Sequence, residues 1–308
     1  MLDLHRLRLL REVRARGTIS ATASALGYST SAISQQLAVL EREVGAPLLE
    51  KAGRNVRLTP AGLVLATRAE VLLAEMEAAE AEVATVVAGR LAGVVRVAAF
   101  QSAVLRIVAP AVKSLAGTHP DIVVEVTEAE VEQSTPALQL QHLDAVVGDE
   151  YHDQPRPIYD DLHLETLLRE HINLILPGDH PAASKKRVPL TDLSEMPWAA
   201  CQPGTGHHNM QLRVCRQLGG FEPRIRHTSD DFLILLELAR TAGAATLLPD
   251  LVHAHEVSGV VVRALAEGSV ERHVYVLTRK TSTPTVAAVA TALQAAATVE
   301  REASSARP

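Results

Sequence analysis

One predicted helix, residues 31–43, has an apolar face and a hydrogen-bonding face. Its apolar residues Ile33, Leu37 and Leu40 recur at helical spacing, which predicts that they are buried. The opposite face carries hydroxyl, carboxamide and guanidinium groups, which can bond to base edges and phosphates in a DNA major groove. The side chains expected to contact DNA are Thr30, Ser31, Ser34, Gln35 and Arg42. The same residue types also suit a plain solvated helix, so the surrounding elements must decide between the two.

A short basic hairpin is predicted directly after this helix. Residues 48–51 and 56–58 form its strands, and residues 52–55 form the turn. Arg54 and Arg57 lie on this hairpin, where guanidinium groups can follow the phosphate backbone or enter a minor groove. A basic hairpin after a recognition helix is typical of a wing, so we expect both arginines to contact DNA.

Three loops later in the chain lead into predicted helix N-termini. The free backbone N–H groups of such a terminus can hold an anion, for example a carboxylate. The residues expected to contact a small-molecule ligand are Gln101, Ser102, Gly204, Thr205 and Ser229. Ordinary helix capping is the alternative role for the Ser and Thr side chains. Asp230 and Asp231 would disfavour an anion if they faced the same site.

The cysteines and the paired histidines carry weaker signals. A reactive thiol needs nearby positive charge, and only Cys215 has arginines close by in the sequence, so Cys201 and Cys215 are predicted to be structural. A thiol redox switch is the alternative. His207 and His208 are adjacent and lack further ligands at a fixed spacing, so no metal site is predicted. No hydrolase, phosphate-binding-loop or zinc-protease motif occurs, and no enzyme is predicted.

The elements around the predicted recognition helix form a compact N-terminal module. Helices are expected at 3–15 and 19–26, with Arg6, Arg8, Arg11 and Arg14 mostly facing outward. Thr59-Pro60 then starts a long helix over 61–88, because a hydroxyl cap followed by proline is a helix-start signal. At 1.5 Å per residue this helix is about 40 Å long. Its apolar stripe needs a partner, and a second copy of the chain is the simplest one.

From Gly93 onward, strands and helices alternate, which predicts a mostly parallel sheet. About 210 residues is generous for one such sheet, so we expect two lobes with a cleft between them. Strands are expected at 94–99, 122–127, 145–148, 162–168, 172–176, 198–201, 224–227, 246–249, 260–265 and 274–278, and helices at 103–115, 135–141, 209–218, 232–241 and 285–299.

Charge is distributed unevenly along the 308 residues. Residues 1–58 contain nine Lys and Arg against five Asp and Glu, a net charge of +4, so the rest of the chain must carry −10 to give the total of −6. A small basic module on an acidic body is typical of a regulator that keeps one end on phosphates. Two cysteines, no apolar run of about 20 residues and no signal-peptide pattern favour a cytosolic protein without a membrane partner.

Taken in this order, the elements resemble a LysR-type transcriptional regulator over the full length. Residues 7–62 are the most specific part of the resemblance. The motifs that carry it are Gly17-Thr18-Ile19, Ala21 with Ala23, Ser31-Ala32-Ile33-Ser34, Leu40-Glu41, Gly45-Ala46-Pro47-Leu48-Leu49 and Leu58-Thr59-Pro60-Ala61-Gly62. The chain departs from the family pattern at two places. Before the recognition helix the family usually has Ser or Thr followed by Gln or Pro, and this chain has Thr30-Ser31 there. In the wing, Leu49-Glu50-Lys51 replaces the family's Phe-x-Arg, which puts a negative charge near the DNA.

The resemblance implies an α+β multidomain fold: a winged helix-turn-helix at 1–58, a linker helix at 59–90 and an effector domain at 91–308. The last resembles periplasmic binding proteins, with one lobe of about 92–165 plus 266–301 and another of about 166–265. The implied partners are promoter DNA, a second chain paired through residues 60–88, a homotetramer, a small-molecule effector of unknown identity and RNA polymerase, with no cofactor. In this family Ser102 and the loop around Gly204-Thr205 face the ligand. An enzyme on the α/β body and an architectural DNA binder remain alternatives.

Overall fold

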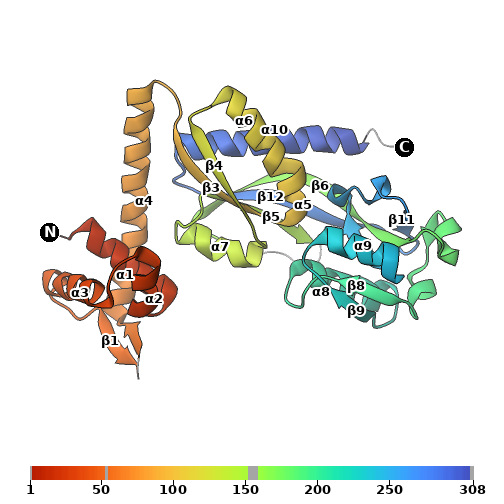
Figure 1. The fold of residues 1–308 in the computed structure, drawn as a ribbon, viewed down its shortest axis with the longest axis horizontal. Coiled ribbons are helices and arrows are strands. Elements are labelled where there is room, and N and C mark those ends of the chain that lie inside the picture. Colours follow the sequence, from red (N-terminus) through yellow and green to blue (C-terminus); the bar gives the residue numbers. More distant parts are fainter. Residues whose placement is uncertain (1, 53–54, 152–158, 306–308) are drawn as a thin grey trace. The chain divides into compact units, whose positions relative to one another are not determined.

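The structure is a computed structural model that describes residues 2–52, 55–151 and 159–305. Arg54, one of the two predicted wing arginines, lies outside the described residues. The chain forms two compact units, Met1–Gly89 and Arg90–Pro308 (Figure 1). None of the described helices combines the length and hydrophobicity that crossing a bilayer requires.

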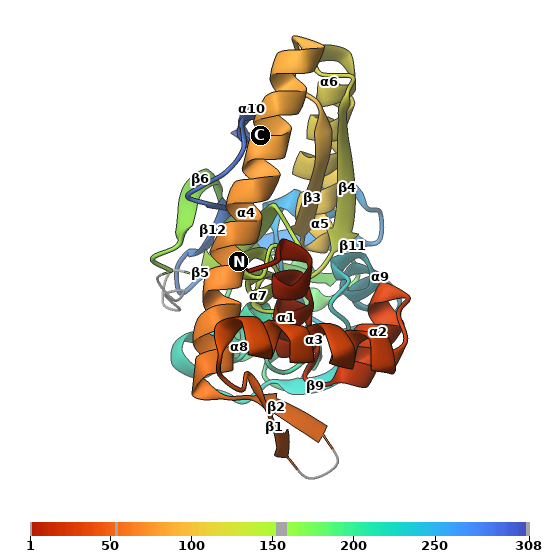
Figure 2. The same ribbon diagram turned by 90° about the vertical axis from the view of Figure 1, so that its left-hand side faces the viewer.

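The first unit consists of three short helices, a hairpin and a long helix. Each helix begins at a side-chain cap, and the three short ones end at a glycine in the left-handed conformation, as local capping rules predict. Figure 2 shows the hairpin projecting from the helices. The elements are α1 (Leu4–Arg16), α2 (Ile19–Leu26), α3 (Thr30–Val44), β1 (Leu49–Ala52), β2 (Asn55–Leu58) and α4 (Pro60–Ala88).

The core of this unit joins α1 and α3 to the start of α4. Leu10, Ile33 and Leu40 are fully buried, and Ala66 and Ala69 bring α4 into the same cluster. The small alanines let the long helix approach α1 closely. The first turns of α4 therefore pack against the three-helix core.

The outward orientation expected for the α1 arginines is wrong for Arg11. Its side chain is buried and its Nη2 lies 2.8 Å from Glu12 Oε1. Arg14 reaches α4 instead of solvent, with Nη1 2.9 Å from Thr67 Oγ1 and 3.1 Å from Glu70 Oε1. Packing of α4 against α1 explains the orientation of Arg14, because the long helix covers part of the surface that this arginine would otherwise present to water.

The second unit is built on an eight-stranded mixed sheet in the order β4-β3-β5-β12-β6-β11-β7, with β10 paired to β6, and on a separate β8-β9 pair. The strands are β3 (Gly93–Ala99), β4 (Ile122–Glu128), β5 (Ala145–Tyr151), β6 (Leu162–Pro177), β7 (Arg187–Val188), β8 (Pro197–Ala200), β9 (Arg224–Thr228), β10 (Thr246–Pro249), β11 (Val260–Leu265) and β12 (Val270–Arg279).

Helices pack on this sheet, and some of them adjoin irregular turns. The helices are α5 (Gln101–Ala103), α6 (Ala109–Thr118), α7 (Val131–Gln139), α8 (Gly206–Arg213), α9 (Phe232–Ala242) and α10 (Pro284–Ser305), with π turns at Val104–Val108 and Val214–Leu218 and 3-10 turns at Pro181–Ser184, Leu190–Leu193, Asp250–Val252 and Ala254–Glu256. The π turn at Val104–Val108 directly precedes α6, which has Pro110 as its second residue.

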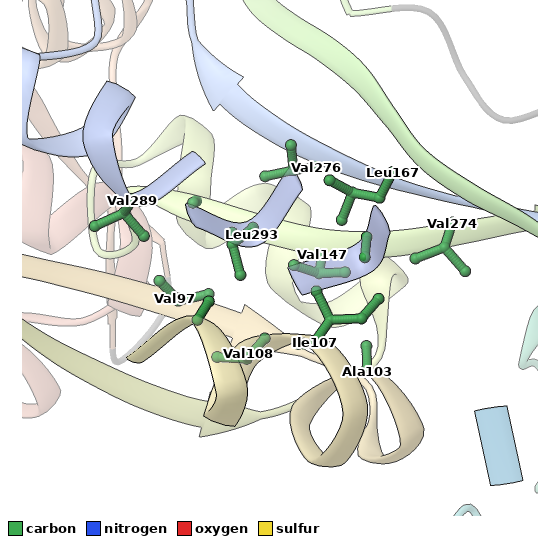
Figure 3. Close-up of a cluster of buried hydrophobic side chains, with 14 of the residues drawn as sticks. Val97, Ala103, Ile107, Val108, Val147, Leu167, Val274, Val276, Val289 and Leu293 are labelled. Carbon is green, nitrogen blue, oxygen red and sulfur yellow. The ribbon is translucent and has the colours of Figure 1, made fainter. Parts of the chain in front are cut away.

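The two largest hydrophobic cores of the second unit mark its two lobes. The first core gathers β3, β5, α6 and α10, with Val97, Val147 and Leu293 at its centre (Figure 3). The second gathers side chains from β6, β8 and α8, among them Leu174 and Trp198. The strands β5, β6 and β12 each contribute to both cores, so they pass from one lobe to the other.

On β6 the change of core falls between Leu168 and Ile172, and on β12 it falls between Val270 and Val274. Both crossings lie a few residues beyond the lobe boundaries expected near 165 and 266. Each crossing therefore puts a short stretch of strand between two cores.

Three expectations about the second unit are wrong. The sheet is parallel only at β4-β3-β5 and β11-β7, whereas β12 runs antiparallel to both β5 and β6. The two strands expected at 162–168 and 172–176 are one strand, β6. The helix expected at 135–141 begins at Val131 and contains Pro136. Strand–helix alternation describes only consecutive units, and these antiparallel pairings join segments far apart in the chain.

Candidate functional site

The hydrogen-bonding face of α3 is open to solvent. Thr30, Ser31, Ser34, Gln35 and Arg42 are all exposed, whereas Ile33, Leu37 and Leu40 on the opposite face are at most 2% exposed. Some of these polar groups make only local bonds: Ser34 Oγ donates to Thr30 O at 2.8 Å, and Arg42 Nε donates to Ala38 O at 3.4 Å. Such contacts exchange easily for a phosphate or a base edge, so the face is available to a ligand.

The recognition face is held in place by the residues that carry the family resemblance. Glu41 Oε1 accepts the N–H groups of Leu48 and Leu49 at 2.8 and 3.0 Å, which ties the end of α3 to the start of the hairpin. Thr59 Oγ1 donates to Pro47 O at 2.8 Å and accepts from Gly62 N at 3.0 Å. These motifs therefore fix the angle between α3, the hairpin and α4.

Of the two predicted wing arginines, Arg57 is described. Its Nε lies 2.6 Å from Glu50 Oε1, and both side chains are exposed. An exposed ion pair of this kind contributes about 0–1 kcal/mol to the free energy of unfolding. A phosphate can therefore compete with Glu50 for the guanidinium group. The negative charge that the sequence places near DNA is thus paired with the wing arginine.

The long helix α4 presents large apolar side chains to solvent. Val64, Val83, Val86 and Val87 are between 63% and 81% exposed, and Leu72 is 47% exposed. A helix that exposes this much apolar surface lacks a partner to cover it.

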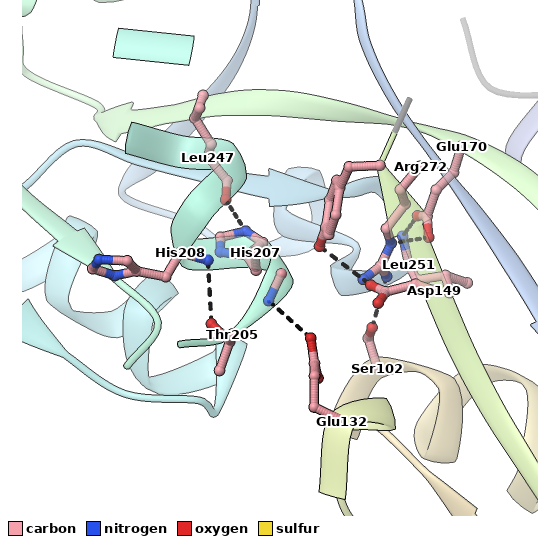
Figure 4. A network of polar contacts seen from close by, with 12 residues as sticks. Ser102, Glu132, Asp149, Glu170, Thr205, His207, His208, Leu247, Leu251 and Arg272 are labelled. Atoms are coloured by element: carbon pink, nitrogen blue, oxygen red, sulfur yellow. Dashed lines mark hydrogen bonds and ion pairs between the residues drawn. The ribbon is translucent and has the colours of Figure 1, made fainter. Parts of the chain in front are cut away.

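In the second unit, a buried arginine lies where the strands cross between the lobes. Arg272 on β12 is fully buried. Its Nε donates to Glu170 Oε1 at 2.7 Å, its Nη1 to Asp149 Oδ2 at 2.9 Å and its Nη2 to Ser102 Oγ at 3.0 Å (Figure 4). Arg272 pairs with Tyr151 on β5 and with Glu170 on β6 in the sheet register. One guanidinium thus joins β5, β6 and the start of α5.

Arg272 also forms one side of a small cavity. The cavity has a volume of about 10 Å³, which is about the space that one water molecule needs. Its guanidinium carbon lies 4.7 Å from the ring centroid of Phe100 and 5.7 Å from that of Phe232. The lining residues are Phe100, Gln101, Glu130, Asp149, Tyr151, Cys201, His207, Asp230, Phe232 and Arg272.

The five predicted ligand residues are placed differently relative to this cavity. Gln101 lines it. Ser102 is 1% exposed, and its hydroxyl accepts from Arg272. Gly204, Thr205 and Ser229 do not line it: Thr205 caps α8 by accepting from His208 N at 3.2 Å, and Ser229 Oγ accepts from Asp231 N at 3.1 Å. Helix and turn capping therefore accounts for the contacts of Thr205 and Ser229.

The N-terminus of α8, where an anion was expected, already holds a carboxylate of the protein. Glu132 on α7 accepts from Gly206 N at 3.2 Å (Figure 4). The oxygen comes from the first lobe and the N–H from the second, so this bond links the two lobes beside the cavity.

Burial and charge shift the pKa values around the cavity. Burial, together with the nearby charges of Asp149 and Glu132, raises the pKa of Glu130 to about 8. Burial and the charge of Arg272 lower the pKa of His207 to about 3, so this imidazole is neutral. Burial also raises the pKa of the Cys201 thiol, and that of Cys215 to about 12. Both cysteines are buried and free.

Comparison with known proteins decides the family. The model of the bacterial regulatory helix-turn-helix protein, lysR family, matches residues 4–63, and the model of the LysR substrate binding domain matches residues 88–298. The chain belongs to the LysR family. A LysR protein is a DNA-binding transcriptional regulator with an effector-binding domain, and it is not an enzyme.

Individual LysR relatives and structures agree with this assignment. The chain is 31% identical over 217 residues to a probable hydrogen peroxide-inducible genes activator of Mycobacterium avium, covering 69% of this chain and 67% of the relative. It is 26% identical over 269 residues to the regulator MetR of Escherichia coli K12, covering 87% and 82%. A full-length OxyR variant of Pseudomonas aeruginosa has the same fold, with a TM-score of 0.70 at 19% identity over 96% of this chain and 95% of that one.

The LysR helix-turn-helix of this chain therefore binds DNA. A related structure, full-length CbnR complexed with its target DNA, matches with a TM-score of 0.58 at 20% identity over 96% of this chain and all of that one. Among the described residues, no group of three or more His, Cys, Asp or Glu side chains is arranged to hold a metal ion.

Sequence reasoning missed the charged residues at the centre of this LysR cleft. Arg272, Asp149 and Glu170 each lie just beyond a strand as it was drawn from the apolar pattern. Asp149 directly follows the strand expected at 145–148, whereas Glu170 and Arg272 lie two residues outside the strands expected at 162–168 and 274–278. A signal was nevertheless present, since Arg272 shares its strand face with Val274 and Val276, both of which are buried.

Proposed function

We propose that this LysR regulator binds promoter DNA in the cytosol as a homodimer, and that a small molecule between the lobes changes that binding. The observation that carries the proposal is the one-sided exposure of α3, with every predicted DNA contact on it open to solvent and the opposite face buried. In a helix-turn-helix this second helix enters the major groove, and its exposed side chains reach the bases.

The DNA contacts are proposed for Thr30, Ser31, Ser34, Gln35 and Arg42 on α3, and for Arg54 and Arg57 on the wing. A direct test compares Arg42→Gln with Arg216→Gln, an exposed arginine in the other unit, by fluorescence anisotropy on genomic fragments from upstream of the gene. Loss of a phosphate contact lowers affinity and reduces the salt slope by about one. Equal affinity and slope for both variants would refute the role of Arg42.

The exposed apolar side of α4 supports pairing through residues 60–88. Two copies of α4 can bury these valines and leucines against each other in the manner of a coiled coil. Light scattering after size exclusion should give twice the mass of 33.0 kDa or more. A homotetramer and contact with RNA polymerase stay predictions of the family resemblance.

The strands that cross between the lobes support a role for lobe movement. Because β5, β6 and β12 are the described strands that contribute to both cores, a small rotation about them opens or closes the cavity around Arg272. A ligand shifts this equilibrium only if it binds one arrangement more tightly than the other. The test is a change in promoter affinity when the ligand is added, and its absence for every ligand that binds the cleft would refute the coupling.

A redox switch is the second candidate function, because the mycobacterial relative carries a peroxide-related name. Peroxide reacts with thiolates, whereas burial keeps Cys201 and Cys215 protonated. We therefore expect hydrogen peroxide to leave promoter binding unchanged. A peroxide response that disappears in Cys201→Ser or Cys215→Ser would favour the redox function over ligand control.

A further inference from the structure

The cavity around Arg272 is built to receive a positive charge. We propose that the effector of this regulator carries a primary ammonium group that binds among Glu130, Asp149 and Asp230. This inference rests on the proposed ligand site between the lobes, and it names the chemical class of the ligand.

Negative groups outnumber positive ones in the lining. Asp149 and Asp230 contribute two carboxylates, and Arg272 contributes the single cation among the lining residues, whereas the raised pKa of Glu130, about 8, keeps that carboxyl group mostly protonated near pH 7. That cation is already engaged, because Arg272 bonds Glu170 and Asp149 through two of its nitrogens. An incoming carboxylate would meet the like charge of Asp230, whereas an ammonium group would be attracted to it and could also lie next to Asp149.

Two acceptor atoms of the lining residues have no hydrogen-bond partner among the described residues: Nδ1 of His207 and Oε1 of Gln101. His207 Nε2 lies 2.8 Å from Leu247 O. A carbonyl only accepts, so Nε2 carries the proton and Nδ1 presents a lone pair. His207 is 5% exposed. Both unpartnered atoms can therefore accept a hydrogen bond, and an ammonium group carries three N–H donors.

Two donors of the cavity, by contrast, are already engaged. Tyr151 OH donates to Asp149 Oδ2 at 3.2 Å, and Arg272 Nη2 donates to Ser102. A buried acceptor without a donor costs about 1–3 kcal/mol. A ligand that brings donors therefore stabilises the closed lobes more than one that brings acceptors.

The volume and the walls also fit an ammonium group. A space for about one water accommodates one nitrogen with its three protons, so the rest of the ligand must extend away from the cavity. The rings of Phe100, Tyr151 and Phe232 line the same space, and aromatic faces attract ammonium cations. The alternative seat for an anion, at the N-terminus of α8, is occupied by Glu132.

The experiment uses the full chain and matched small probes. Butylamine and 1,4-diaminobutane are compared with butan-1-ol and butyrate at constant ionic strength near pH 7, with thermal unfolding followed by Trp198 fluorescence and binding by calorimetry. We expect the two amines to raise the unfolding temperature of the second unit and the other two probes to leave it unchanged. Both amines should bind, because the far end of the ligand lies outside the cavity.

A variant and its control separate this site from general charge effects. Asp230→Asn keeps the Oδ1 acceptor that Gln202 N uses at 2.8 Å and removes the charge, so it should fold and bind the amines about tenfold more weakly. Asp192→Asn removes an exposed carboxylate paired with Lys185 in the same lobe and should bind them like the parent chain.

Each other outcome has a distinct meaning. Equal binding of amines to both variants would show a general ionic effect and overturn the ammonium site. Binding of butyrate instead of the amines would overturn the ammonium class while leaving the cleft as the ligand site. No stabilisation by any probe would overturn the ammonium assignment, and promoter binding of the unliganded chain would still test the DNA-binding proposal separately.

Discussion

Replacing Gly62 by alanine should unfold the DNA-binding unit at a lower temperature. A Cβ on Gly62 would lie 2.2 Å from Leu48 O and 3.1 Å from Leu48 C, so α4 and the hairpin would have to separate by about 1 Å to reach ordinary contact. Leu48 cannot yield freely. Its N–H is held by Glu41 at 2.8 Å, and its carbonyl accepts from Thr59 N at 2.9 Å.

The expected change in the free energy of unfolding is the sum of two opposing contributions. Overpacking against a fixed backbone costs about 3 kcal/mol, and the better helix propensity of alanine returns about 1 kcal/mol. The net loss of about 2 kcal/mol corresponds to about 8–16 °C for a unit of this size. Promoter affinity should fall with it, because Gly62 helps set the angle between α4 and the recognition helix.

Calorimetry and circular dichroism on the full chain measure this change, and the single tryptophan provides an internal reference. Trp198 is buried in the second unit, so its fluorescence transition should not move in Gly62→Ala. Gly117→Ala is the matched control, since a Cβ there meets nothing within 4 Å, and alanine should stabilise α6 slightly. An unchanged transition of the first unit in Gly62→Ala would refute the close contact on which this reasoning rests.

Three further predictions concern charged side chains. Arg272→Met should destabilise the second unit by about 3–5 kcal/mol in urea unfolding, because it leaves the 5%-exposed Glu170 side chain without its cation. Glu41→Ala should cost about 2 kcal/mol by unpairing two backbone N–H groups, whereas Glu43→Ala, which breaks a more exposed pair with Arg6, should cost at most about 1 kcal/mol. The raised pKa of Glu130 means that the folded chain binds its proton more tightly than the unfolded chain, so stability should fall as pH rises from about 4.5 to about 8, and Glu130→Gln should flatten that decline.

The N-terminal unit could be predicted closely from the sequence because its signals are local. Thr18 and Thr59 cap the helices that follow them, and Gly27 and Gly45 end helices in the left-handed conformation. The apolar period of α3 gave its buried face correctly. What the pattern could not give was the partner of each arginine, since the contacts of Arg14 on α4 join residues more than fifty positions apart.

The cleft was harder to predict because its chemistry depends on long-range pairing. Arg272 and Asp149 are brought together by antiparallel strands that are 123 residues apart in the chain. Their charges also interrupt the apolar runs by which strands are recognised. The loops at helix N-termini were a sound guide to capping, as Thr205 and Ser229 show, but the carboxylate at the start of α8 comes from Glu132 of the chain itself.

Selection from a pool of random duplex DNA by the full-length chain tests the central claim most directly. If the exposed face of α3 reads base edges, the bound pool should converge on one motif arranged as an interrupted inverted repeat, and Gln35→Ala should change the preferred base within each half. A bound pool with the same composition as the starting pool, or a motif that Gln35→Ala and Ser34→Ala leave unaltered, would contradict the claim.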